Sequence, residues 1–166
     1  MSIIAMYLIF AMLAVVWLDS TRFIIPNWLV GSLLLLYPLA VWLSPASVDW
    51  KMAMVAMLAV FAAGYVVFSM KWMGGGDIKL LSAIALWIGF SWELLNYIFL
   101  VSIAGGIFSL LLIIGRKWAP LLLKSAQEKP LPRLLQHGAP VSYGVAIALV
   151  FMWWIIDNKV PALAVH

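Results

Sequence analysis

Two acidic side chains, Asp19 and Asp77, stand at the ends of long apolar stretches of the sequence. Asp19 closes the stretch that begins at Ile3, and Asp77 follows three consecutive glycines and opens the stretch that begins at Ile78. Ionisable groups at such positions are costly to hold near lipid, so they indicate a functional site. The other four acidic residues are expected to be solvated surface charges. Three of them lie at the opposite ends of apolar stretches, and one lies in a basic segment: Asp49, Glu93 and Asp157, and Glu128.

Two carboxylates brought together from separate helices could catalyse hydrolysis. At close range they cannot both ionise, so the pair shares one proton. The ionised member can take a proton from water as general base, while the protonated member polarises a carbonyl as acid. This is aspartic-protease chemistry, which needs neither a metal nor a covalent intermediate. Glycines 74–76 leave no side chain beside Asp77, so an extended peptide could approach the backbone closely.

The residues alone leave other interpretations open. Asp77 could simply cap the helix that it opens, because an acidic group is favourable at a helix N-terminus. A glycine triplet is most often a turn. The two acids could also form a proton or cation relay in a small transporter or an assembly scaffold, although transporters often show internal repeats and none is visible here.

The elements that must position these side chains are membrane-spanning helices. Of the 166 residues, 67% are hydrophobic and only 10% are charged, against about 25% charged in a soluble domain. An all-α polytopic membrane protein is predicted, with residues 1–166 forming a single membrane-embedded domain. Its six expected spans, taken from the uncharged runs, are residues 3–18, 28–43, 52–70, 78–92, 94–115 and 139–156.

The basic residues predict the orientation. Eight of the ten lie in or just beyond segments 19–27, 71–77 and 116–138, and only Lys51 and Lys159 lie elsewhere. Because basic residues favour the cytoplasmic side, both termini are expected to be non-cytoplasmic, with Asp19 and Asp77 near the cytoplasmic edge. The net charge of +4 then reflects loops beside anionic membrane lipid rather than a nucleic-acid surface.

Some chemistry is excluded or disfavoured by composition. The chain has no cysteine, which excludes disulfides, thiolate metal sites and a cysteine nucleophile. His137 and His166 are isolated, so neither a metal nor another cofactor is expected.

Small residues suit close helix contacts, which we expect at Gly64, Gly105 and Gly106. Tryptophans are expected to anchor helix ends at the membrane interface, namely Trp28, Trp92, Trp118, Trp153 and Trp154.

Residues 74–80 read GGGDIKL, and residues 19–27 read DSTRFIIPN. The first segment resembles the GxGDxK signature of the prepilin peptidases, the type IV prepilin leader peptidase family of GxGD aspartic peptidases, and the second resembles the other half of that site. Residues 139–148 resemble the stretch that enters the last span of the family, but Pro140 and Tyr143 are separated here by two residues, which leaves that register open. Leu18 before Asp19 disfavours the presenilin-like branch.

The resemblance implies a catalytic pair of Asp19 and Asp77, with the acid and base roles open. It also implies residues that shape the site or bind substrate: Gly74, Gly75, Gly76, Lys79, Arg22, Pro26 and Asn27. Lys79 has two interpretations. It either binds acidic substrate or lowers the proton affinity of the pair, or it is an ordinary lysine that snorkels to the interface. Arg22 has the same two interpretations.

The resemblance further implies a membrane endopeptidase of the bacterial inner membrane. Its substrate would be a prepilin or pseudopilin with a basic leader and an apolar helix, cut at the cytoplasmic membrane edge. Only about eight residues separate Asp19 from the second predicted span, so the sequence is most similar to the small Flp/Tad pilus type, without a methyltransferase domain. The alternative is a transporter or pilus-assembly scaffold, and no oligomeric state is predicted.

Overall fold

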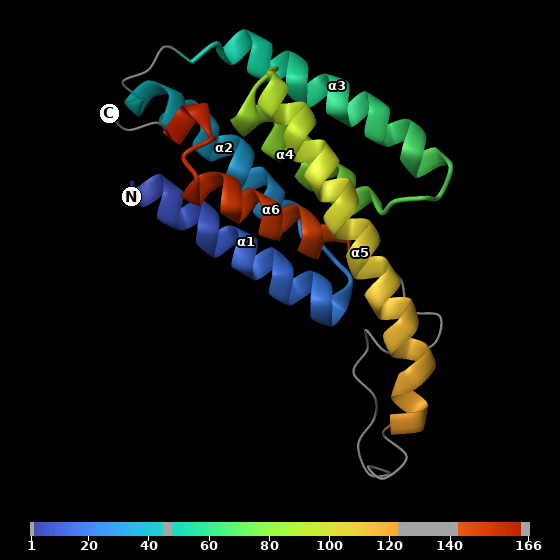
Figure 1. The fold of residues 1–166 in the computed structure, drawn as a ribbon. Coiled ribbons are helices and arrows are strands. Elements are labelled where there is room, and N and C mark those ends of the chain that lie inside the picture. The colour runs from blue at the N-terminus through green and yellow to red at the C-terminus, as the bar shows by residue number, and fades with distance from the viewer. Residues whose placement is uncertain (1, 45–47, 123–142, 164–166) are drawn as a thin grey trace.

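The protein is a bundle of helices, as the sequence predicts (Figure 1). The computed structural model describes residues 2–44, 48–122 and 143–163, and side chains 119–122 are not part of that description. No strand occurs among the described residues. The helices are α1 (Ile3–Arg22), α2 (Asn27–Leu43), α3 (Trp50–Ser69), α4 (Gly75–Ile88), α5 (Trp92–Leu122) and α6 (Tyr143–Ile156), followed by a 3-10 turn, η2 (Pro161–Leu163).

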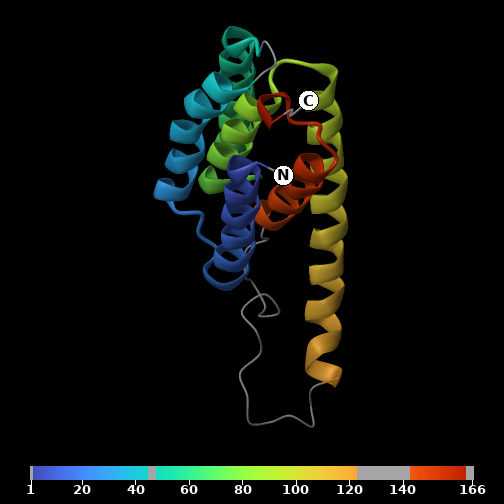
Figure 2. The same ribbon diagram turned by 90° about the vertical axis from the view of Figure 1, so that its left-hand side faces the viewer.

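Helix α4 is the central element of the bundle. It contacts α2, α3, α5 and α6, and ten of its 14 residues are buried. Helix α1 packs against α6 and α2, while α6 also packs against α5. Figure 2 shows α1 and α6 side by side, with α5 extending past the rest of the bundle. Helix α4 is therefore held from several sides.

Local capping explains where several helices begin. The Ser2 hydroxyl accepts a hydrogen bond from the Ala5 N–H at 3.2 Å and caps α1. Asp49 caps α3 by accepting from the N–H groups of Lys51 and Met52. Pro26 precedes α2, where its fixed φ and missing N–H are tolerated. Helix α2 thus begins at Asn27, one residue before the expected span 28–43.

Three helices are long and apolar enough to cross a membrane: α1, α3 and the part of α5 from Trp92 to Trp118. Helices α2 and α6 are apolar but shorter, and α4 has 14 residues, about 21 Å at about 1.5 Å per residue. These elements make this a membrane protein. The crossing of all six helices and the side on which the termini lie stay predictions.

Several helix boundaries differ from the expected spans. Helix α1 continues to Arg22, past the expected end at residue 18, and α4 begins at Gly75 rather than at residue 78. The fourth span was expected to reach residue 92, but α4 ends at Ile88 because Gly89 takes a left-handed φ of 78°. The fifth was expected to end at residue 115, but α5 continues through Arg116 and Lys117 to Leu122. Hydropathy marks the part of a helix that suits lipid, whereas backbone hydrogen bonds continue through charged residues. Residues 139–142 of the sixth expected span lie outside the described residues.

The small-residue prediction is confirmed at two of three glycines. A Cβ at Gly64 would lie 2.6 Å from Ile78 Cγ2, and one at Gly105 would lie 2.9 Å from the Tyr143 ring. A Cβ at Gly106 would meet nothing within 4 Å. Consecutive helical residues point about 100° apart, so only one of the two neighbouring glycines can face α6.

The tryptophan prediction is wrong for Trp154. This side chain is only 1% exposed and packs edge-on against Tyr97 at 5.7 Å between ring centroids. The other four tryptophans are exposed, as a position at the membrane interface requires: Trp28, Trp92, Trp118 and Trp153. In the sequence Trp153 and Trp154 are indistinguishable, and only the packing of α6 on α5 separates the inward from the outward ring.

Candidate active site

Asp19 and Asp77 line the same cavity, although they come from different helices. Asp19 belongs to α1 and Asp77 to α4, and their side chains are 5% and 8% exposed. The cavity has a volume of about 290 Å³ and is otherwise lined by Phe23, Ile24, Ile25 and glycines 74–76. The two carboxylates are close enough to interact electrostatically. The structure thus brings the two acids together in an otherwise apolar surrounding.

The end of α1 places residues 23–25 around Asp19. The helix continues one turn past Asp19 to Arg22, and the Phe23 N–H donates to the Asp19 carbonyl at 3.1 Å. Phe23 has a left-handed φ of 55°, a conformation that costs a non-glycine residue about 1–2 kcal/mol. The chain reverses there and leads Ile24 and Ile25 back over the cavity. Backbone strain of this kind is concentrated at functional sites.

Asp77 is held by backbone N–H groups. Gly74 is the N-cap of α4, so Asp77 occupies the third helical position. Its carboxylate accepts hydrogen bonds from the N–H groups of Gly74 and Gly144. The bond from Gly74 is one half of a capping box, and the negative charge lies at the positive end of the helix dipole. Asp77 therefore caps α4 and faces the cavity at once, so the capping and catalytic interpretations do not exclude each other.

The three glycines before Asp77 meet different surroundings. A Cβ at Gly74 would lie 3.0 Å from Asp77 Oδ2, and a Cβ at Gly76 would lie 3.3 Å from Ile25 Cβ. Both distances are tighter than ordinary side-chain contacts. A Cβ at Gly75 would lie 3.5 Å from Phe68, which is an ordinary contact. The turn therefore needs small residues chiefly at positions 74 and 76.

Gly144 is a site residue that the sequence analysis did not assign. A Cβ at this position would lie 2.7 Å from Asp19 Oδ2 and 2.8 Å from Ile25 Cδ1, while its N–H reaches Asp77. Gly144 therefore lies between the two acids, at the start of α6. The signal available in the sequence was the stretch 139–148, which contains Gly144. Residues 139–142 of that stretch lie outside the described residues.

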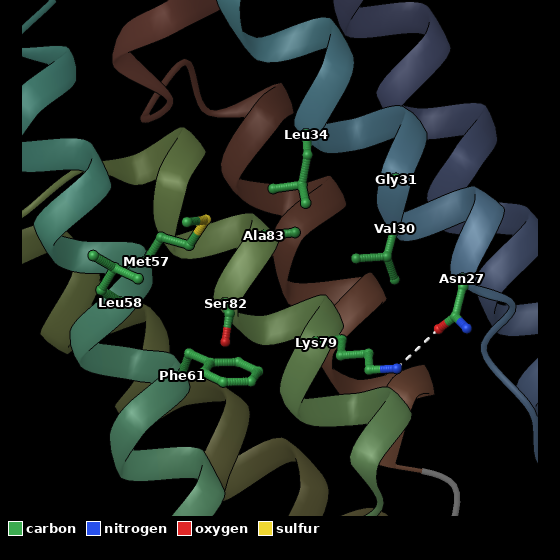
Figure 3. Close-up of a pocket in the computed structure, with 10 residues that line it drawn as sticks. All are labelled: Asn27, Val30, Gly31, Leu34, Met57, Leu58, Phe61, Lys79, Ser82 and Ala83. Carbon is green, nitrogen blue, oxygen red and sulfur yellow. Dashed lines mark hydrogen bonds between the residues drawn. The ribbon is translucent and has the colours of Figure 1, made fainter.

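Lys79 lies on another face of α4. Two residues after Asp77, it is turned by about 200° around the helix, and its Nζ donates to Asn27 Oδ1 at 3.0 Å (Figure 3). Two of the predicted site residues therefore contact each other, but away from the carboxylates. Pro26 precedes α2, and Arg22 is exposed at the end of α1. Nothing in this arrangement supports an action of Lys79 on the proton affinity of the pair.

In the described part of the chain, no three His, Cys, Asp or Glu side chains gather as a metal site would require. His137 and His166 lie outside the described residues. What the cavity offers is a pair of interacting carboxylates, one of them oriented by two N–H groups. Such a pair can act as general acid and general base on one bound water.

The sequence matches the model of one protein family, the type IV leader peptidase family, over residues 6–110. This is well over half of the chain, and it includes both Asp19 and Asp77. It ends before α6, so Gly144 enters the site from outside the matched segment. No curated protein and no solved structure gives a significant match to the chain.

Proposed function

This chain belongs to the type IV leader peptidase family, and from that premise we propose that it is an aspartic endopeptidase in which Asp19 and Asp77 form the catalytic pair. Family membership supports a prepilin leader peptidase role. The observation that carries the finer proposal is one cavity of about 290 Å³ lined by two buried carboxylates from α1 and α4. A relay in a transporter would use the same two acids, but the family match favours the peptidase.

In the proposed reaction, one carboxylate is ionised and the other is protonated. The ionised group takes a proton from a bound water, whose oxygen attacks the scissile carbonyl carbon, while the protonated group donates a hydrogen bond to the carbonyl oxygen. The tetrahedral intermediate then loses its C–N bond, and a proton from the pair goes to the leaving amine. The Gly74 and Gly144 N–H groups keep Asp77 oriented throughout.

The proposed substrate is a type IV-like prepilin of the Flp/Tad kind, with a basic leader and an apolar helix. Its scissile bond would meet the pair at the cytoplasmic membrane edge of the bacterial inner membrane. The short connection between α1 and α2 supports this small single-domain type without a methyltransferase domain. This connection comprises only residues 23–26. It is shorter than the eight residues between Asp19 and the second predicted span, because α1 continues to Arg22.

The direct test uses the variants Asp19→Asn and Asp77→Asn. Each keeps the size and shape of the side chain but removes the charge and the acidic proton, and replaces one acceptor oxygen by an NH₂ donor. Co-expression with a candidate prepilin, followed by mass measurement of the substrate, should show no detectable leader removal by either variant in the time that the wild type needs to process the substrate completely. The control is Asp49→Asn, because Asn caps a helix about as well as Asp and Asp49 is the exposed cap of α3. Leader removal by either variant at the wild-type rate would refute the proposed pair.

A further inference from the structure

A second hollow of the molecule lies between α2 and α3, with α4 as its floor (Figure 3). Its volume is about 370 Å³, and its walls are mainly apolar side chains, with Val30 and Leu34 from α2 and Met57, Leu58 and Phe61 from α3. We call it the α2–α3 groove. Its volume falls within the range of small-molecule sites, about 300–1,000 Å³.

The α2–α3 groove opens beside exposed apolar side chains of α3. Leu58 is 57% and Phe61 46% exposed, and both belong to α3, one of the helices long and apolar enough to cross a membrane. The groove also lies away from the cavity of Asp19 and Asp77, because its floor is the face of α4 that carries Lys79 and Ser82. The proposed peptidase chemistry leaves it unused.

One end of the groove is cationic. Lys79 and Asn27 lie there, and the bond between them uses the Asn27 carbonyl and one Lys79 proton. The other protons of the ammonium group and the amide NH₂ of Asn27 remain as donors. In the part of the chain that the structure describes, Lys79 bonds to the Asn27 amide and forms no ion pair with a carboxylate. An anionic group bound beside Lys79 would complete this end of the groove.

We propose that the α2–α3 groove binds one anionic phospholipid. Its phosphate receives hydrogen bonds from Lys79 Nζ and the Asn27 amide, and one acyl chain lies along Val30 and Leu34. From Asn27 to Leu34 the helix rises about 10 Å, which is most of one leaflet of a hydrocarbon core about 30 Å thick. Basic pockets between transmembrane helices bind anionic headgroups in this way. A zwitterionic lipid fits the apolar walls equally well but carries no net charge to offset Lys79.

Two glycines make a matched test of the groove. A Cβ at Gly31, which lines the groove, would meet nothing within 4 Å, and the same is true of Gly106 on α5. The variant Gly31→Leu should therefore fill the groove without straining the fold, while Gly106→Leu adds the same side chain elsewhere. Lys79→Gln removes the charge and keeps a long polar side chain.

The experiment measures lipid bound to delipidated full-length protein in detergent by native mass spectrometry. Phosphatidylglycerol and phosphatidylcholine with identical acyl chains are titrated in parallel, with inorganic phosphate as competitor. Wild type and Gly106→Leu should retain one phosphatidylglycerol, about tenfold more tightly than phosphatidylcholine, a difference of about 1.4 kcal/mol. Lys79→Gln should lose this preference, and Gly31→Leu should bind both lipids about tenfold more weakly or worse. Thermal melting in the same detergent identifies any variant that has failed to fold.

Four results would overturn the proposal. They are equal binding of the two lipids by wild type, an unchanged preference in Lys79→Gln, unchanged binding by a folded Gly31→Leu, and complete displacement of phosphatidylglycerol by millimolar inorganic phosphate. If Gly31→Leu binds phosphatidylglycerol normally but slows cleavage of a prepilin, the groove belongs to the substrate helix instead. If Gly31→Leu does not fold, Lys79→Gln and the smaller Gly31→Ala decide the question.

Discussion

The close approach of Asp19 and Asp77 in one cavity depends on the missing side chain of Gly144. Gly144 is the point at which α6 meets both acids, with its N–H on Asp77 and its bare Cα against Asp19. Two helices can bring two acids near each other, but the third helix fixes the separation between them. The geometry of the pair is therefore a property of α1, α4 and α6 together.

We predict that Gly144→Ala lowers the rate of leader removal by about 100-fold, because displacing a catalytic group by about 1 Å costs roughly that much. The added Cβ would fall 2.7 Å from Asp19 Oδ2, so the carboxylate must move. The measurement is the initial rate of cleavage of a purified prepilin. Gly106→Ala makes the same substitution in open space and should leave the rate unchanged. A Gly144→Ala enzyme as fast as wild type would show that Asp19 need not stay where the structure places it.

At the residue scale, the sequence predicted the two acids and glycines 74–76, which line the same cavity, but not Gly144. Asp19 and Asp77 stood out because charge is rare at the ends of apolar stretches. Gly144 could not be assigned to the site from the sequence, because only the fold shows that this glycine lies against Asp19 and Asp77. The separation of Lys79 from Asp77 could have been anticipated, since residues two apart in a helix point in nearly opposite directions.

At the scale of the helices, the close contact of α3 and α4 holds the first turns of α4 in place. Gly64 faces Ile78, the residue after Asp77, and a Cβ there would lie 2.6 Å from Ile78 Cγ2. A side chain at position 64 would therefore push on the turn of α4 that carries Asp77. The contact between Gly64 and Ile78 therefore helps to position Asp77 as well as to stabilise the packing of α3 on α4.

We predict that Gly64→Ala destabilises the protein by about 1–3 kcal/mol, as overpacking a close contact usually does. Ile78→Ala removes the obstructing Cγ2, so the double variant should be less destabilised than the sum of the two single variants, because neighbouring sites are not additive. Thermal unfolding in a mild detergent measures all three, and Gly31→Ala, in open space, is the control. Strict additivity would mean that α3 and α4 are not in the contact described.

Element boundaries were predictable only where a chemical signal coincided with the helix end. Pro26 marks the start of α2, since proline is favourable at a helix beginning, but proline alone is no end signal, because Pro38 lies inside the same helix. The end of α5 was not predictable from charge, because Arg116 and Lys117 continue the helix. Gly89 ends α4, and a glycine at this position is a common helix stop, whereas the expected span continued to residue 92 because the run stays uncharged. The inward position of Trp154 required the packing of α6 against α5.

At the scale of the whole molecule, the basic residues predict which end of the bundle is cytoplasmic. Reporter fusions after residues near 25, 73 and 127 should report cytoplasm, and fusions near residue 47 and after residue 160 should report the other side. The physical reason is that eight of ten basic residues lie in or beside the first group of loops. Alkaline phosphatase and green fluorescent protein fusions give opposite signals and control for expression. A cytoplasmic C-terminus would contradict the six-span arrangement.

The central claim is that Asp19 and Asp77 act as one unit on the scissile bond. A double-mutant cycle tests it most directly, with single-turnover rates of leader removal measured for purified Asp19→Asn, Asp77→Asn and the double variant in lipid. Residues that act as a unit are not additive, so the double variant should retain the same residual rate as either single variant. A double variant slower by the product of the two single effects would show two independent contributions, and it would contradict a shared catalytic pair.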